Sequence, residues 1–434
     1  MNQNQSTDEF TAITRANEAK ALKAELEADA IVNAVPMKIT FEFTGDCNLH
    51  CFFCDCEFGR NEYRKKGVHK FAMDENMFRA MAETAFPHVS VVNPTVIGEP
   101  MTFPHFDLMV EYAEKYDVKL EIVTNGMLLK NPRLESMMPL LDRLTMSFDG
   151  GTKETFEHCR TGSKFDVIIK NLRDFRDLRK SLNLTKQVKF TFGVTLMREN
   201  IEEFPRIVEW AHELDVDEVS AGHLLVFTKE LRGSSLFEHK ALANEWILKA
   251  KKRADELGVK LTAPALFDLQ DDVVAEISTR TEELDAEVGA IGMIPRMDDN
   301  DGATQSEVPD RDVELLQTES PPPAWAAEKG RYWCQFAWRQ VFVSIAGHVS
   351  PCCHQSRPVV GNVFEQDWDE IWNGKEYQAL RRGLYEGKPM PYCGSCSLLA
   401  EQGLVDYKEE GYIFEDKFPD QTRADIRPKK GDSK

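Results

Sequence analysis

The sequence has no long apolar run, and it has less positive than negative charge. A membrane-spanning helix needs about 20 consecutive apolar residues, and residues 1–11 are too polar for the apolar region of a signal peptide. Lys and Arg number 53 against 73 Asp and Glu, which gives a net charge of -20. Phosphate backbones are bound through clustered Lys and Arg. The composition therefore disfavours a nucleic-acid partner and predicts a cytoplasmic protein with no membrane association.

Cysteine, in contrast, is plentiful, with 10 residues, and in a reducing compartment this favours metal ligation over disulfides. Cys47, Cys51 and Cys54 fall in one short segment with the spacing C-x3-C-x2-C. Three thiolates can hold a cubane iron-sulfur cluster and leave one iron without a protein ligand. A zinc knuckle is the alternative, but zinc sites usually pair two C-x2-C halves, and Cys56 stands too close to Cys54 for that spacing. Cys159 has no close cysteine neighbour and is expected to be a buried apolar thiol.

Strand-like and helical segments alternate through the first part of the chain. We expect a helix at 8–32 and strands at 38–43, 91–97, 119–123, 143–148, 188–196 and 218–226. Segments 74–85, 106–115, 165–181 and 201–214 have helical periodicity, and 244–257 and 259–262 add a helix and a short strand. This order predicts an α/β fold with a parallel sheet, a partial (β/α)6 barrel similar to a TIM barrel. In such sheets the chemistry lies at the carboxyl edge, where the first strand delivers its cysteines.

Small polar turns follow the next strands. Gly98-Glu99-Pro100 comes after the second strand, Asn125 after the third, and Ser147 at the end of the fourth. Each alone is ordinary turn chemistry. In succession after the cysteine segment, they predict contacts to a nucleoside ligand. Arg160 could pair with a carboxylate of that ligand as a guanidinium fork does, or lie at the surface.

A second group of cysteines lies near the C-terminal end and consists of Cys334, Cys352, Cys393 and Cys396. A β-hairpin predicted at 340–345 with a turn at 346–347 would bring Cys334 and Cys352 to the same side. Four thiolates complete a closed iron-sulfur cluster, with zinc as the alternative on spacing alone. Cys353 could replace Cys352 as a ligand.

These patterns divide the chain into five expected parts. The segment 282–329 is acidic and poor in large apolar residues, as flexible linkers are. The parts are an N-terminal helical extension at 1–36, a barrel domain at 37–265, an acidic linker at 266–330, a small α+β cluster domain at 331–400 and a tail at 401–434.

The first cysteine segment, with Phe53 before its last cysteine, resembles the signature of the radical S-adenosylmethionine (SAM) superfamily. The resemblance implies that Cys47, Cys51 and Cys54 hold a 4Fe-4S cluster whose open iron binds SAM. Carried over to the strand ends, it implies a set of SAM contacts: Phe53, Gly98, Glu99, Pro100, Asn125, Ser147 and Arg160. The Gly98-Glu99-Pro100 turn is a shortened form of the family's glycine-rich motif.

The C-terminal region resembles the SPASM and Twitch extensions of radical SAM enzymes. The resemblance rests on the C-x17-C and C-x2-C spacings, on Gly361-Asn362-Val363, and on Ile371-Trp372-Asn373-Gly374 continuing through Tyr377 to Leu380-Arg381. A full SPASM pattern has seven cysteines, and here those after Cys396 are missing. The resemblance thus implies one auxiliary 4Fe-4S cluster, as in the Twitch form.

Together these resemblances imply an enzyme that splits SAM into methionine and a 5'-deoxyadenosyl radical, which removes a hydrogen atom from a substrate. The auxiliary cluster would accept an electron, so the expected activity is oxidation of a small metabolite or a peptide side chain. A flavodoxin- or ferredoxin-type reductant is the implied electron donor. A radical epimerase or peptide maturase is the alternative enzyme. A noncatalytic iron-sulfur or zinc protein is the alternative outside the enzymes.

Overall fold

The computed structural model describes residues 7–54, 71–95, 97–130, 132–226, 228–269, 322–352, 358–396 and 399. Cys56, Cys353, segment 270–321 of the predicted linker and the predicted tail lie outside the described residues.

The described strands form one sheet in the order β10-β9-β8-β1-β2-β3-β4-β5-β6-β7. Strands β1 to β7 run parallel in chain order, which confirms the predicted α/β fold with a parallel sheet. The strands are β1 Lys38–Phe41, β2 Val91–Asn93, β3 Lys119–Thr124, β4 Leu141–Ser147, β5 Lys189–Leu196, β6 Glu218–His223, β7 Lys260–Thr262, β8 Gln340–Val343, β9 His348–Ser350 and β10 Gly361–Asn362.

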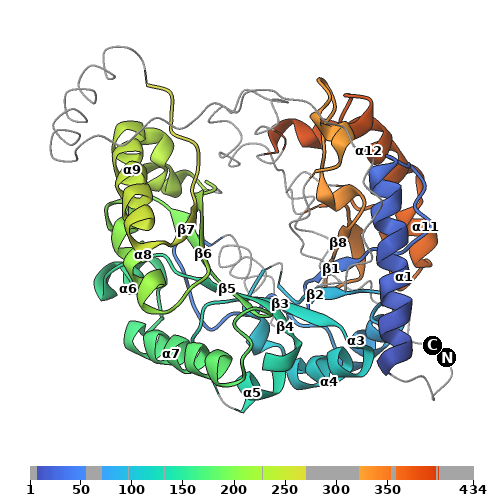
Figure 1. Ribbon diagram of the computed structural model, residues 1–434, viewed down its shortest axis with the longest axis horizontal. Helices are drawn as coiled ribbons and strands as arrows, with labels where there is room; N and C mark the ends of the chain where they lie inside the picture. Colours follow the sequence, from blue (N-terminus) through green and yellow to red (C-terminus); the bar gives the residue numbers. More distant parts are fainter. Residues whose placement is uncertain are drawn as a thin grey trace.

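Helices line the outer side of this curved sheet (Figure 1). The connections between β1 and β7 carry α3 Glu75–Ala85, α4 Phe106–Tyr116, α5 Arg133–Met137, α6 Lys153–Cys159, α7 Phe165–Ser181, α8 Phe204–Glu213 and α9 Lys240–Leu257. The N-terminal helix α1, Thr7–Leu26, lies beside α11, Trp368–Trp372, and α12, Lys375–Tyr385, in Figure 1. Parallel strands need such crossover connections, and the helices cover the outer face of the sheet.

The core is aromatic directly before the first cysteine segment. Phe41 and Phe43 are fully buried, and their rings stack with centroids 5.1 Å apart. Phe43 also meets Phe78 of α3 at 5.4 Å and Phe103 at 5.3 Å. Aromatic packing of this kind buries much apolar area and fixes ring orientation. The residues directly before the cysteine segment are therefore held rigidly in the core.

The C-terminal unit continues the sheet of the barrel. Strand β8 pairs parallel with β1, with Lys38 opposite Gln340 and Phe41 opposite Val343. Strand β9 then pairs antiparallel with β8, as the predicted hairpin requires. Trp325, in the 3-10 turn Ala324–Ala327, is buried and donates its indole N–H to the Glu25 carbonyl at 2.8 Å. Trp325, within the predicted linker, is thus packed on α1, and the C-terminal unit begins before residue 331.

Several predicted elements are shorter than expected, among them the strands predicted at 38–43 and 218–226, which end at Phe41 and His223. The cause is clear in two cases. The helix predicted at 8–32 ends at Leu26, because Ala28 has a left-handed φ of 55° and the chain turns so that Asp29 N–H bonds the Ala24 carbonyl at 2.8 Å. The strand predicted at 91–97 ends at Asn93, whose side-chain oxygen accepts from Thr95 N–H at 2.9 Å. Such a local turn, followed by a proline without an N–H, ends a strand.

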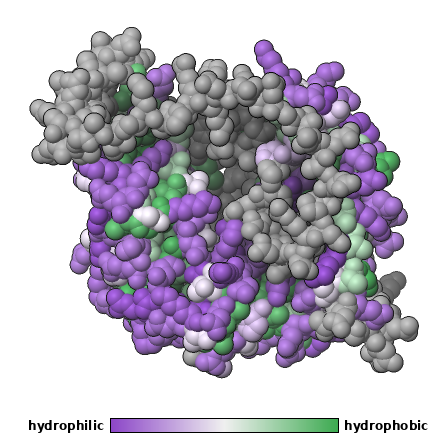
Figure 2. Space-filling view, viewed as in Figure 1, coloured by the Kyte–Doolittle hydropathy of each residue, from purple (hydrophilic) through white to green (hydrophobic). Residues whose placement is uncertain are grey.

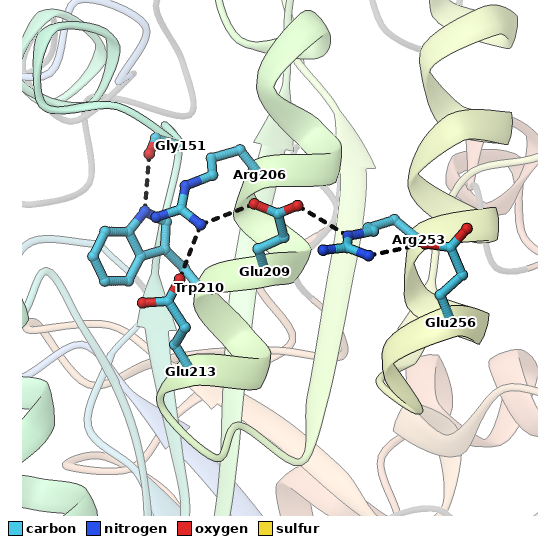
Figure 3. A network of polar contacts seen from close by, with 7 residues as sticks. All are labelled: Gly151, Arg206, Glu209, Trp210, Glu213, Arg253 and Glu256. Atoms are coloured by element: carbon cyan, nitrogen blue, oxygen red, sulfur yellow. Dashed lines mark hydrogen bonds and ion pairs between the residues drawn. The ribbon is translucent and has the colours of Figure 1, made fainter.

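The outer helices α8 and α9 are joined by a polar network (Figure 3). Glu209 accepts from Arg206 and from Arg253, both at 2.9 Å. Trp210 donates its indole N–H to the Gly151 carbonyl at 2.9 Å, so α8 also fixes the turn that follows β4.

The coloured part of the face in Figure 2 is mainly hydrophilic, with hydrophobic residues in small groups among hydrophilic ones. Within the part of the chain that the structure describes, no helix combines the length and the apolar character that crossing a membrane requires.

Candidate functional site

The first three cysteines lie in the segment after β1. Cys51 is buried, whereas Cys47 and Cys54 are partly exposed. Burial raises the pKa of Cys51 to about 11; the Arg160 guanidinium acts against this shift, and thiolates at Cys54 and Cys47 add to it. The structure thus brings the three sulfur atoms within electrostatic reach of one another, as the spacing predicts.

The turn after β2 is built into the cysteine segment. Gly98 has φ of 79°, and a Cβ there would lie 2.6 Å from the Asp46 carbonyl oxygen and 2.7 Å from that of Thr44. Only glycine, which has no Cβ, can lie this close to the two carbonyl oxygens and adopt this φ. The next residue, Glu99, donates its N–H to Asp46 O at 2.8 Å. Pro100 then begins the 3-10 turn Pro100–Thr102.

The Glu99 carboxylate is enclosed by the next strand end. It accepts from Thr124 Oγ1 at 2.8 Å and from Asn125 N–H at 2.8 Å. Its exposed fraction is 1%, and burial raises its pKa to about 7, although these hydrogen bonds act in the opposite direction. Glu99 therefore lies inside the wall beside the cysteines, not at an open surface.

Asn125 links the third strand to the cysteine segment. Its side-chain amide donates to Asn48 Oδ1 at 2.9 Å and approaches Cys47 Sγ at 3.6 Å. Its own oxygen accepts from Met127 N–H at 3.0 Å. Asn125 was predicted to touch SAM, and the structure places it directly beside a predicted cluster ligand.

The fourth strand end carries a buried ion pair. Ser147 ends β4 and is partly exposed, and Asp149 two residues later is fully buried. Asp149 pairs with Arg160 at 2.5 Å and accepts from Thr195 N–H at 2.7 Å. Sequence reasoning gave Asp149 no role, although it stands in the turn noted after the fourth strand.

Arg160 lies between Asp149 and the cysteine segment. Its guanidinium carbon is 6.0 Å from the Phe53 ring centroid, and its charge lowers the pKa of Cys51. Its Nε is buried and has no partner among the described residues. The alternative of a surface arginine is wrong, since only 9% of Arg160 is exposed.

Cys159 lies in a small apolar cluster with Met197 and Leu224, against Phe52 and Phe53. It is fully buried, and burial raises its pKa to about 12. The prediction of a buried apolar thiol is confirmed.

The four C-terminal cysteines also come together. Burial raises the pKa of Cys334, and thiolates at Cys352, Cys396 and Cys393 add to that shift. Cys393 N–H bonds the Met390 carbonyl at 2.8 Å and Cys396 N–H bonds the Cys393 carbonyl at 3.1 Å, in the 3-10 turn Pro391–Ser395. Hairpin, turn and helix α12 thus gather four thiols from segments far apart in the chain.

The two sets of thiols lie beyond different ends of the β1–β8 pair. Cys334 precedes β8, and Cys352 follows β9, which runs back beside β8 with Ser350 opposite Phe342. The start of β8 lies beside the start of β1, whereas Cys47 follows the end of β1. The two sets of thiols therefore form two separate sites.

Both sets suit a cluster by the chemistry of their donors. Iron-sulfur clusters are held by Cys thiolates, and each thiolate binds a different iron, so the sulfur atoms stand further apart than around a single ion. Within the described ranges, no three His, Cys, Asp or Glu side chains are grouped closely enough for one metal ion.

Two family models match the chain. A model described as radical SAM superfamily matches residues 41–211, and one described as an iron-sulfur cluster-binding domain, SPASM, matches residues 334–397. These ranges include all seven cysteines of the two sites.

Two curated proteins are similar over most of their length. The AdoMet-dependent heme synthase of Methanosarcina barkeri is 25% identical over 405 residues, 88% of this chain and 96% of that protein. The PqqA peptide cyclase of Gluconobacter oxydans is 25% identical over 368 residues, 83% of this chain and 82% of that protein. Among solved structures, Streptococcus suis SuiB is similar with a TM-score of 0.51 and 15% identity, over 93% of this chain and 81% of SuiB. SuiB structures with S-adenosylmethionine and with the precursor peptide SuiA are similar to the same degree.

Proposed function

Because the chain belongs to the radical SAM superfamily and carries a C-terminal SPASM domain, we propose that it oxidises its substrate. It is a radical SAM enzyme that binds SAM, a 4Fe-4S cluster and auxiliary iron-sulfur. When bound at the first site, SAM and the cluster supply a 5'-deoxyadenosyl radical. The substrate then loses one hydrogen atom, one electron and one proton, which amounts to a two-electron oxidation.

The residues around the first site have separate tasks in this proposal. Cys47, Cys51 and Cys54 would hold the SAM-binding 4Fe-4S cluster. Asn125 fixes the cysteine segment through Asn48. A guanidinium forms strong charge-assisted hydrogen bonds with a carboxylate, so Arg160 orients the carboxylate of SAM.

Asp149 holds Arg160 in place from inside the protein, because it is fully buried and its second oxygen is bound to the backbone. Glu99 holds the second and third strand ends to the cysteine segment from inside the wall, and the Gly98-Glu99-Pro100 turn that carries it is the proposed contact to the SAM amino group. Phe53, Ser147, Gly98 and Pro100 complete the proposed SAM contacts.

The second set of thiols carries the proposal of an oxidation. Four protein ligands, Cys334, Cys352, Cys393 and Cys396, close a cluster and leave no iron for SAM. A closed cluster in a radical enzyme suits electron transfer. The ligand set supports one auxiliary cluster, as in the Twitch form.

The proposed substrate is a peptide side chain or a small polar metabolite. PqqA peptide cyclase and the SuiB complex with a precursor peptide support the first class. AdoMet-dependent heme synthase supports only the more general point that a relative has a non-peptide product. Helix α1 is packed, with Phe10, Ala21 and Ala24 buried, so it does not serve as a free arm for a peptide. A ferredoxin- or flavodoxin-type protein is the proposed reductant.

A radical epimerase or a peptide maturase is the second candidate, supported by the same peptide-modifying relatives. Product analysis separates the two. Net oxidation with deoxyadenosine formation supports our proposal, whereas solvent deuterium in an unoxidised product supports the epimerase.

Iron content after anaerobic reconstitution tests the two sites. Two four-iron clusters predict about eight irons per chain. Replacing Cys393 and Cys396 by Ser should leave about four irons and preserve SAM cleavage while abolishing substrate oxidation. Cys159→Ser is the matched control, because this buried thiol lies in neither ligand set. Zinc without sulfide in the wild-type protein would contradict the proposal.

A further inference from the structure

The side-chain amide of Asn125 is fixed in one orientation. Its Oδ1 accepts from Met127 N–H at 3.0 Å, and a backbone N–H can only donate. The amide nitrogen Nδ2 therefore faces the other way, where it donates to Asn48 Oδ1 at 2.9 Å and to Cys47 Sγ at 3.6 Å. Asn125 is 5% exposed, so this donor is shielded from bulk water.

The turn that carries Asn125 is held from two sides. Asn125 donates its own backbone N–H to Glu99 Oε2 at 2.8 Å. From helix α7, Asn171 donates its side-chain amide to the Gly126 carbonyl at 2.8 Å. Such supporting hydrogen bonds orient the groups that act on a metal ligand. The Asn125 amide is therefore directed at Cys47 by the protein alone.

Cys47 receives a second hydrogen bond from its own segment. Leu49 donates its N–H to Cys47 Sγ at 3.4 Å, and Leu49 is also buried. Hydrogen bonds to the sulfur atoms are among the determinants of the reduction potential of an iron-sulfur cluster. Reduction places more negative charge on the sulfur ligands, and a hydrogen bond to a charged acceptor is stronger than one to a neutral acceptor. Donors at Cys47 therefore stabilise the reduced cluster more than the oxidised one.

We propose that Asn125 raises the reduction potential of the SAM-binding cluster by donating its amide N–H to Cys47 Sγ. Without this donor the cluster is harder to reduce, so the electron donor of the enzyme must be a stronger reductant. This role is separate from contact with SAM, because it acts on the cluster through a cysteine ligand. The inference rests on the ligand set Cys47, Cys51 and Cys54 proposed above.

The test measures the midpoint potential of the first cluster by a redox titration followed by electron paramagnetic resonance. SAM is omitted, so loss of a SAM contact alone would not move the result. The full chain carries Cys393→Ser and Cys396→Ser, so that the first cluster alone gives the signal. In this background, Asn125→Ala should shift the one-electron equilibrium at least tenfold toward the oxidised form, which lowers the midpoint potential by about 59 mV.

Asn171→Ala is the matched control. Asn171 holds the same turn, but its amide donates to the Gly126 and Met127 carbonyls and not to a sulfur. This variant should leave the midpoint potential unchanged. A shift equal to that of Asn125→Ala would assign the effect to the position of the turn and overturn the proposal.

Two further measurements keep the test valid if Asn125→Ala does not fold. Asn125→Asp keeps an oxygen for Met127 N–H and replaces the donor by a carboxylate oxygen, so it should lower the potential at least as much. In the background chain labelled with 15N in the asparagine side-chain amides, the reduced cluster should show a 15N hyperfine coupling.

Three outcomes decide between the proposal and its premise. An unchanged potential in either Asn125 variant, with the irons of the first cluster in place, would overturn the proposal. Absence of the 15N coupling would overturn it as well. A background chain that binds no iron at the first site would instead refute the ligand set on which the inference rests.

Discussion

Glu25 of α1 joins the barrel to the C-terminal unit, and its replacement should have a large effect on stability. The carboxylate is 1% exposed and accepts from Trp333 Nε1, Arg339 Nε and Arg339 Nη2, each at 2.7 Å. Removing one partner of a buried ion pair leaves the other charge unpaired and costs about 3–5 kcal/mol. Each kcal/mol shifts the melting temperature of a domain of this size by roughly 2–4 °C. Glu25→Leu should therefore melt at least about 6 °C below wild type.

Two further variants isolate the ion pair in the same anaerobic melting assay. Glu27 is the control: it is exposed and lies 3.9 Å from Lys23, so Glu27→Gln should change stability by less than about 1 kcal/mol. Adding Arg339→Met to Glu25→Leu removes both charges and should recover most of the loss, because apolar replacements of buried pairs are often neutral. If Glu25→Leu alone has the melting temperature of the wild type, the conclusion that Glu25 stabilises the contact between the barrel and the C-terminal unit is refuted.

Three shorter predictions concern charge at other positions. Asp149→Asn breaks the ion pair with Arg160, so the KM for SAM in a deoxyadenosine assay should rise about tenfold or more. An unchanged KM would refute the role of Asp149. The control is Asp166→Asn, which breaks the exposed pair with Lys153. Glu99 has a pKa raised from 4.5 to about 7, so its contribution to stability is full below pH 4.5 and is lost as the pH rises through about 7. The free energy of unfolding of the wild type should fall by about 3 kcal/mol between these two pH values, and Glu99→Gln should abolish this fall. Parallel melting profiles of both proteins from pH 5 to 8 would contradict the raised pKa. Arg253→Met breaks the exposed pairs of Figure 3 and should cost less than about 1 kcal/mol; a larger loss in urea denaturation would give that network a structural role.

Local patterns were sufficient to predict most of the barrel. Alternating strands and helices predicted its order. The cysteine spacing predicted the first thiol set, because ligands close in sequence must lie close in space, whereas the second set also needed the predicted hairpin at 340–347 and the resemblance to SPASM and Twitch domains. The second strand was predicted to run to residue 97 but ends at Asn93, because a side-chain hydrogen bond within the turn competes with strand pairing.

Contacts between distant segments could not be predicted in this way. The pairing of β8 with β1 joins residues about 300 positions apart, and nothing in either segment specifies its partner. The ion pairs of Asp149 with Arg160 and of Glu25 with Arg339 could not be predicted either. In the sequence each of these residues is only a charged side chain in a turn or on a helix, and such a residue usually lies at the solvated surface.

The binding and cleavage of SAM at Cys47, Cys51 and Cys54 is the central claim, and Cys51→Ala tests it most directly. The measurement is the release of methionine and 5'-deoxyadenosine from SAM under dithionite, in reconstituted protein with its auxiliary iron confirmed. The account predicts that release is abolished, because the first cluster has lost a ligand from the most buried of its three positions. Release at the wild-type rate would contradict it.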